Sequence, residues 1–181
     1  TTEYFHDYAR NMALCDYVSL TDHSDLLTER EWREIEKATA DHEEPGRFAT
    51  LLGYEWSNEN ANNRGGHFNF YFARRNGKLL SAAGADVLPA IACVDQVGDP
   101  FLVIPHAHKP GDWTVRYPEQ VRVVEIYSQH AQFEWFGRRF LETGNKVGFI
   151  GGSDSHMANP GHSCTPGSRP RWGLGGIFAR T

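Results

Sequence analysis

Short apolar segments of strand length alternate with helix-like segments along most of this chain, and this alternation limits the folds open to it. The strand-like runs lie at residues 16–20, 47–55, 67–73, 100–106, 121–127, 146–152 and 174–179. Helical spacing of apolar residues marks 4–15, 86–94, 131–144 and a segment that begins at Thr28 and ends before Pro45. Apolar strands that alternate with helices are typical of βα units, so the sequence predicts an α/β fold with a mainly parallel sheet or barrel.

Two local patterns define individual elements. Thr28 and Glu31 have the spacing of a capping box, which predicts a helix that begins after Thr28. The strand at 67–73 alternates between two faces, so one face carries three phenylalanines and the other carries His67, Asn69 and Tyr71.

The composition fits one globular domain over residues 1–181. Hydrophobic residues make up 40% of the chain, and 13% of the residues are aromatic, which argues against disorder. No apolar run reaches the roughly 18 residues of a membrane helix, and a chain of net charge −5 without a basic stripe does not indicate nucleic-acid binding. Three scattered cysteines favour a reducing compartment, so we expect a soluble, cytoplasmic protein.

Nearly every strand-like run delivers a carboxylate or an imidazole, mostly at its C-terminal end. These residues are Asp22, His23, Glu55, His67, His106, His108, Glu125, Asp154 and His156. In a parallel barrel the C-terminal strand ends converge on one face, so these residues would share a pocket. Burying unpaired carboxylates costs several kcal/mol each, and divalent cations would neutralise them. The mixture of imidazole and carboxylate suits zinc, manganese or iron better than calcium or magnesium.

Three positions support a metal centre in particular. Asp154 and His156 are two residues apart, so extended backbone directs both side chains to the same side. The two oxygens of Glu55 can bridge a pair of ions. Glu125 lies inside an apolar strand, where an unpaired charge is seldom tolerated.

Most of these residues also admit a structural interpretation. Asp22 or Ser24 can serve as the N-cap of the next helix. His67 can be a half-buried neutral histidine that is hydrogen-bonded to Asn69. Two histidines close to prolines can be surface-loop residues, His106 and His108. Three others fall on expected helices or their ends and are interpreted as solvated surface residues: His6, His42 and His130.

Six segments in order resemble the PHP (polymerase and histidinol phosphatase) superfamily, and they are closest to its DUF3604-type branch. The segments are VSLTDHSD, LLGYEWS, GGHFNFYF, VIPHAH, VVEIYS and GFIGGSDSH, and the resemblance runs from about residue 4 to residue 179. It implies a distorted (βα)7 TIM-like barrel of PHP type. It also implies a centre of up to three divalent metal ions and hydrolysis of phosphoesters.

The resemblance implies a metal ligand at each matching position. Glu55 would bridge two ions, and His67 and His106 would complete one of these two sites. A third ion would be bound by His23 and His156, and the first ion by Asp154.

The same resemblance implies catalytic and pocket residues. The catalytic residues would be Glu55, Asp154, His106 and Asp22, of which Asp22 orients ligands. Candidates for a proton shuttle are His106, His108 and Asp22. Glu125 would be a pocket residue. Further pocket candidates follow from their place in or beside the ligand-bearing loops, and these are His108, Arg64, Lys109, Arg169 and Arg171. The four basic residues of this set either hold a phosphate or are solvated loop charges.

The first strand of the family has no counterpart in this sequence before Thr1. The family begins with a strand that carries His-x-His, and residues 4–15 resemble the helix that follows this strand. We therefore expect a fragment that lacks the first βα element and binds fewer than three ions, and the sequence leaves open whether further material follows Thr181. A missing strand leaves an open edge that invites pairing, so we expect association, such as a homodimer.

These observations predict a metal-dependent hydrolase in which a metal-activated hydroxide attacks a small phosphorylated substrate. Two alternatives stay open. The same activated water would serve an amide or lactone hydrolase, and a fragment with missing ligands would bind metal without catalysis.

Overall fold

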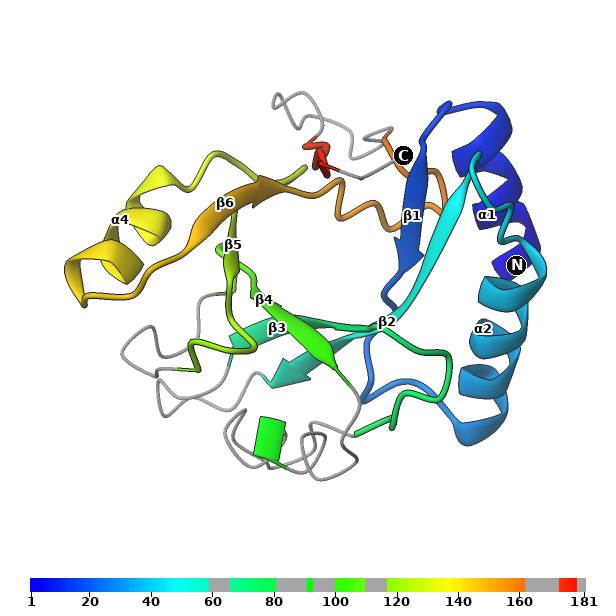
Figure 1. Cartoon of the computed structure of the whole chain (residues 1–181), viewed down its shortest axis with the longest axis horizontal. Coiled ribbons are helices and arrows are strands. Elements are labelled where there is room, and N and C mark those ends of the chain that lie inside the picture. Colours follow the sequence, from blue (N-terminus) through cyan, green and yellow to red (C-terminus); the bar gives the residue numbers. More distant parts are fainter. Residues whose placement is uncertain (59–65, 81–90, 93–99, 110–116, 162–172, 179–181) are drawn as a thin grey trace.

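A computed structural model describes residues 1–58, 66–80, 91–92, 100–109, 117–161 and 173–178 (Figure 1). Its helices are α1 (Thr2–Asn11), α2 (Glu29–Asp41) and α4 (Glu134–Glu142). Its strands are β1 (Tyr17–Leu20), β2 (Ala49–Asn58), β3 (Gly66–Phe72), β4 (Phe101–Pro105), β5 (Val123–Tyr127) and β6 (Gly148–Gly151). Each of these elements falls on a segment that the sequence predicts, and the prediction of a mixed α/β fold is confirmed.

The strands form two sheets around a central space (Figure 1). The first sheet has the order β1-β2-β3-β4, and the second consists of β5 and β6, with β5 beside β4. The β1–β2 and β5–β6 pairs are parallel, whereas the β2–β3 and β3–β4 pairs are antiparallel. The expectation of a mainly parallel sheet is therefore wrong, and the sheets do not close into a barrel within the described residues.

The length of one connection explains the antiparallel β2–β3 pair. Only residues 59–65 separate β2 from β3, whereas a parallel pair needs a crossover of a dozen or more residues. The sequence contained this signal in the length of its Asn-rich loop. The register of the pair places Glu55 opposite Asn69 and Ser57 opposite His67.

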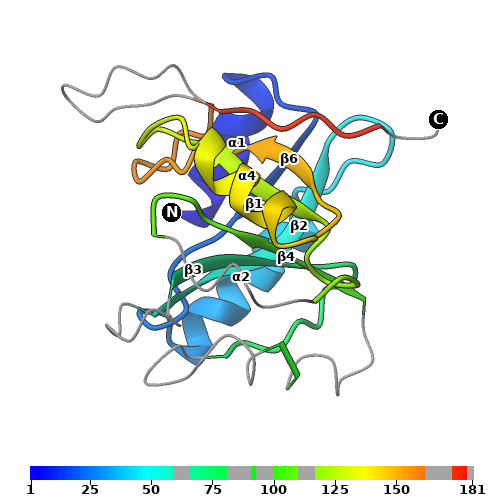
Figure 2. The same cartoon turned by 90° about the vertical axis from the view of Figure 1, so that its left-hand side faces the viewer.

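Helices α1 and α2 cover the outer face of β1 and β2, and α4 covers the second sheet (Figures 1 and 2). The capping box of α2 forms as predicted, since Thr28 accepts from the Glu31 amide and Glu31 accepts from the Thr28 amide. The main core lies between α2 and the phenylalanine face of β3, and it contains Trp32, Ile35, Tyr54, Phe68, Phe70 and Phe72. The predicted two-faced β3 strand is thus confirmed, because its polar side is left for the interior.

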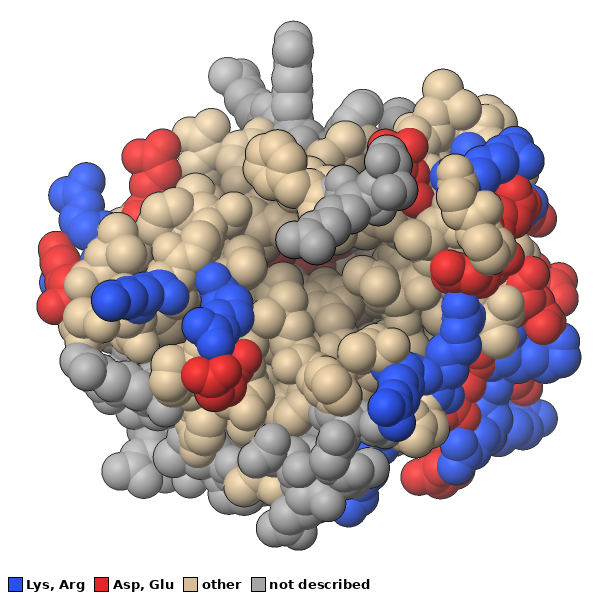
Figure 3. Space-filling view, in the orientation of Figure 1, with Lys and Arg blue, Asp and Glu red and all other residues tan. Residues whose placement is uncertain are grey.

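The interior side of both sheets lines a cavity of about 1130 Å³. Asn69 and Tyr71 of β3 face this cavity, and Glu55 and Glu125 also line it. Figure 3 shows the hollow at the centre of the face seen in Figure 1, with the charged side chains gathered mainly over the flanking helices. The cavity, with the polar side chains that line it, is therefore open to solvent on this face.

Residues 173–178 do not form the strand that the sequence predicts at 174–179. The Tyr17 hydroxyl donates to the Gly175 carbonyl at 2.6 Å, and a Cβ on Gly173 would lie 2.5 Å from the Gly152 carbonyl. Side-chain and van der Waals contacts thus hold this glycine-rich segment against β1 and β6 instead of a β-ladder. The helix predicted at 86–94 lies mostly outside the described residues.

Candidate metal centre

The parallel β1–β2 pair brings His23 beside Glu55. The chain that leaves β1 continues to pair with β2, because the Glu55 amide donates to the Asp22 carbonyl at 2.9 Å and the Ser24 amide donates to the Glu55 carbonyl at 2.7 Å. His23 therefore forms an isolated β-bridge with Glu55. The helix that follows is capped by Thr28, so the interpretation of Asp22 or Ser24 as its N-cap is wrong.

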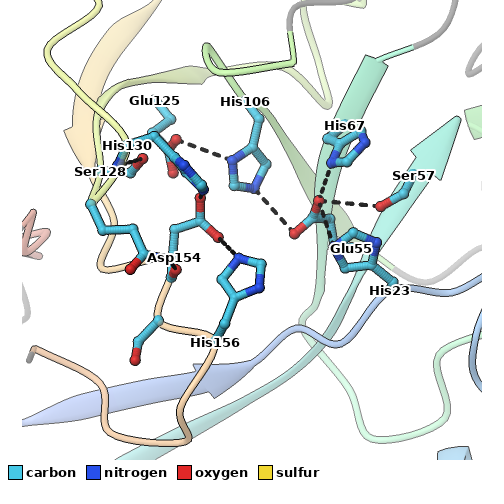
Figure 4. Close-up of polar contacts among 12 residues, drawn as sticks. His23, Glu55, Ser57, His67, His106, Glu125, Ser128, His130, Asp154 and His156 are labelled. Carbon is cyan, nitrogen blue, oxygen red and sulfur yellow. Dashed lines mark hydrogen bonds and ion pairs between the residues drawn. The ribbon is translucent and has the colours of Figure 1, made fainter. Parts of the chain in front are cut away.

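The carboxylate of Glu55 is buried among three imidazoles (Figure 4). Its Oε1 lies 2.5 Å from His67 Nδ1 and 3.5 Å from His23 Nε2, and its Oε2 lies 3.7 Å from His106 Nε2. The Ser57 hydroxyl adds a hydrogen bond of 3.2 Å. Burial alone would raise the pKa of Glu55, but the His67 hydrogen bond and the three nearby histidines lower this pKa to about 2. Glu55 is therefore an anion with two oxygens that face different histidines.

His106 connects Glu55 to a second buried carboxylate. Its Nδ1 lies 3.1 Å from Glu125 Oε1, and both side chains are almost completely inaccessible to solvent. Burial would lower the pKa of His106, but Glu125, Glu55 and Asp154 together raise this pKa to about 10. The interpretation of His106 as a surface-loop residue is therefore wrong.

Asp154 is the centre of the other half of the cluster. Its Oδ1 lies 3.3 Å from His156 Nε2, and its Oδ2 lies 2.9 Å from His130 Nε2. The ring of His130 stacks on His108, with centroids 3.8 Å apart and planes inclined by 7°. The backbone of Asp154 has a φ of +49°, a left-handed conformation that aspartate adopts more readily than most residues.

Three groups of ligand atoms result, each with all its atoms within 4.8 Å of one another. The groups are His23, Glu55 and His67; His106, His108 and Asp154; and His130, Asp154 and His156. Buried nitrogen atoms of the cluster, among them His106 Nε2 and His108 Nδ1, have no hydrogen-bond partner among the described residues. A polar atom buried without a partner costs free energy, and a divalent cation would satisfy it. The donor set therefore fits a metal of the zinc, manganese or iron class.

The structure brings together the residues that the sequence predicts as ligands. The six residues His23, Glu55, His67, His106, Asp154 and His156 all fall in these three groups. The predicted pocket residue His108 joins them, and Glu125 contacts His106. His67 is buried and contacts Glu55, so the interpretation of His67 as a half-buried residue is wrong.

The remaining predicted residues lie beside the cluster or outside the described part. Asp22 lines the cavity next to His23, and burial raises the pKa of its carboxyl. Lys109 has an exposed side chain, and its carbonyl accepts from the His67 amide at 3.0 Å. The positions that lie outside the described residues are Arg64, Arg169 and Arg171.

Three histidines differ from the sequence interpretation. His130 belongs to the cluster and not to a solvated helix end, because α4 begins only at Glu134 and a turn at 128–131 presents His130 after β5. The signal was present, since His130 follows its strand as His106 and His156 follow theirs. His6 is completely buried in α1 and stacks on the partly buried His42, so the prediction of two solvated residues is also wrong.

Comparison with known proteins relates the chain to a family and to two solved structures. Residues 2–86 match the family described as "Protein of unknown function (DUF3604)". No curated protein matches the chain. PsfC from Pseudomonas syringae PB-5123 has a TM-score of 0.61 at 16% identity, over 86% of this chain and 68% of PsfC.

The second structure is a two-domain protein from Bacteroides vulgatus ATCC 8482 that contains a predicted PHP-like metal-dependent phosphoesterase. It has a TM-score of 0.53 at 17% identity, over 86% of this chain and 47% of that protein. The present chain thus spans about half of the two-domain protein. The comparisons show a chain whose N-terminal half matches the DUF3604 family and whose fold is that of these two bacterial proteins.

Proposed function

We propose that this chain carries the metal centre of a phosphoesterase that acts on a small phosphorylated substrate. One observation carries the proposal: imidazoles from several strands converge on the buried carboxylates of Glu55 and Asp154 inside one cavity. The likeness in fold to a protein that contains a predicted PHP-like metal-dependent phosphoesterase supports this reaction class. The same proposal includes a distorted barrel of PHP type. The two sheets line a common cavity, as the walls of a barrel do, although within the described residues they are not joined into one closed sheet.

The positions of the side chains suggest how the ions are divided. Glu55 presents Oε1 to His23 and His67 and Oε2 to His106, so Glu55 would be a ligand shared by two ions. Asp154 and His156 lie on the opposite wall, and the rings of His156 and His23 are 6.5 Å apart. Bound divalent ions would supply Lewis acidity toward phosphoryl oxygens and lower the pKa of a coordinated water.

The protein's own side chains bind and orient. Glu125 holds the His106 ring through Nδ1, so that His106 Nε2 points toward Glu55. Asp22 and Glu55 line the same cavity, and the raised pKa of Asp22 suits a group that passes a proton to a leaving group. Lys109 is a candidate for contact with substrate phosphate at the rim.

The proposal is tested by hydrolysis of aryl phosphate monoesters and diesters after loading with Mn²⁺ or Zn²⁺. We expect turnover that falls at least about 100-fold in Glu55→Gln, because this change removes the shared ligand. The exposed Glu34→Gln on α2 is the matched control and should retain full activity.

The result also separates the alternatives. Hydrolysis of amides or lactones without hydrolysis of phosphoesters would show that the substrate is an amide or a lactone and would reject the phosphoesterase proposal. Full metal loading without turnover of any panel member would leave a metal-binding domain and reject the enzymatic proposal.

A further inference from the structure

A hydrogen-bonded turn at residues 128–131 positions His130 in the cluster. The Ser128 amide donates to the Ala131 carbonyl at 3.2 Å, and the His130 amide donates to the Ser128 hydroxyl at 3.3 Å. Ser128 and Gln129 are buried, although they lie in a loop. The position of His130 is therefore set by packing and by hydrogen bonds.

The turn is also tied to the loop that carries Asp154. The Gln129 side-chain amide donates to the Asp154 carbonyl, and the Gln129 backbone amide donates to the Ser153 carbonyl. These bonds connect the turn of His130 to Asp154, whose backbone lies in the left-handed region with a φ of +49°. Strain of this kind at the junction of two loops is a feature of ligand sites.

The contact between His130 and Asp154 is close but is not a hydrogen bond. The two atoms are 2.9 Å apart, yet Asp154 Oδ2 is buried and has no hydrogen-bond partner among the described residues. A buried carboxylate oxygen in this condition calls for a cation.

Four imidazoles surround the carboxylate of Asp154. His106, His108, His130 and His156 all have a ring nitrogen near this one carboxylate. The ring of His108 stacks in parallel on the ring of His130, with centroids 3.8 Å apart, and this contact restricts the orientation of His130. Imidazole nitrogen and carboxylate oxygen together form a donor set for a divalent cation.

We propose that His130, Asp154 and His156 bind a divalent cation of the zinc, manganese or cobalt class at the mouth of the cluster, separate from the ion at His23, Glu55 and His67. This inference rests on the proposed metal centre and adds His130 to its ligands. The side chains of His130 and His156 are 32% and 59% exposed. The site therefore has coordination positions that face solvent, where a phosphate oxygen has access.

The test counts bound Co²⁺ by equilibrium dialysis and elemental analysis, with the visible Co²⁺ spectrum as a second readout. His130→Gln and His156→Gln should each lose the same one equivalent, and the double variant should lose no more than either single variant. His67→Gln should lose a different equivalent, so His67→Gln with His130→Gln should lose two. His42→Gln, which changes a histidine at the C-terminal end of α2 that belongs to none of the ligand groups, should bind as the unmodified chain does.

The outcomes separate this inference from the proposed function. A His130→Gln variant with unchanged Co²⁺ content and spectrum overturns the His130 site and leaves the metal centre intact. Losses in His130→Gln and His67→Gln that do not add show a single site and also overturn it. An unmodified chain that binds no Co²⁺ rejects the metal centre itself. Circular dichroism of each variant confirms that lost equivalents do not reflect unfolding.

Discussion

Gly152 leaves no room for a side chain beside Glu125, because a Cβ at this position would lie 2.9 Å from Glu125 Oε2. Gly152, which follows β6, thus has a packing role beside the pair formed by Glu125 and His106. Gly152→Ala should displace the Glu125 carboxylate and release the His106 ring that it holds.

We expect this change to weaken metal binding about 10- to 100-fold, the usual effect of losing a group that orients a ligand. The measurement is isothermal titration with Mn²⁺. Gly148→Ala at the start of β6 is the matched control, since the nearest neighbour of a Cβ there is the Arg122 carbonyl at 3.9 Å. Equal affinities for the two variants would contradict the role of Glu125.

Metal removal should lower the thermal stability of the protein. An ion that binds only the folded chain stabilises it by about 2.7 kcal/mol at a concentration 100 times its dissociation constant. We therefore expect the melting temperature to fall after EDTA treatment and to recover with Zn²⁺ or Mn²⁺. This fall in melting temperature should disappear in the double variant Glu55→Gln/Asp154→Asn. If the double variant still shows the full fall, the ions bind elsewhere in the protein.

Acid should destabilise the metal-free protein through Glu55 and His108. The pKa of Glu55 is lowered to about 2, so its contribution is present above its ordinary value of 4.5 and is lost as the pH falls toward 2. Burial and the neighbouring His130 lower the pKa of His108 to about 4, so stability is also lost as the pH falls from 6.5 to 4. Urea unfolding in EDTA should show a free energy that declines from about pH 6.5 downward. In His108→Gln the part between pH 6.5 and 4 should flatten.

The alkaline side should show the opposite dependence through His106. Its pKa is raised to about 10, so its favourable contribution is complete below 6.5 and is lost as the pH rises through 10. A free energy of unfolding that stays constant from pH 7 to pH 10 in the metal-free protein would argue against the charged pairing of His106 with Glu125.

The capping box of α2 should contribute measurably to stability. Thr28→Ala removes the hydroxyl that accepts from the Glu31 amide, and loss of an N-cap costs about 1 kcal/mol. The measurement is the midpoint of urea unfolding. Glu34→Gln on the exposed face of the same helix should change the free energy by less than about 0.5 kcal/mol.

Association of the chain remains a proposal that light scattering tests. Among the described residues β1 pairs only with β2, and Met12, Leu14 and Leu174 expose large apolar side chains near this region. We expect a mass above that of one chain, 20.4 kDa, at micromolar concentration. A monomer at all concentrations would reject the proposal.

The helices in the described part of the chain include none with the length and apolar character of a membrane span.

The local pattern of the sequence determined the elements and identified most of the candidate ligands. Thr28 and Glu31 define the start of α2, and the alternation of β3 sends three phenylalanines to the core and His67 to the interior, because these effects act over a few residues. The position of polar residues at or near strand ends is also a local pattern, and it identified seven of the residues in the three ligand groups.

Tertiary structure decided the pairing of strands and the contacts between loops. The antiparallel β3–β4 pair, the packing of residues 173–178 and the approach of His130 to Asp154 depend on segments far apart in the chain. Spacing along the sequence does not report such distances. Whether an imidazole is solvated or faces a carboxylate is therefore set by which loops the fold places side by side.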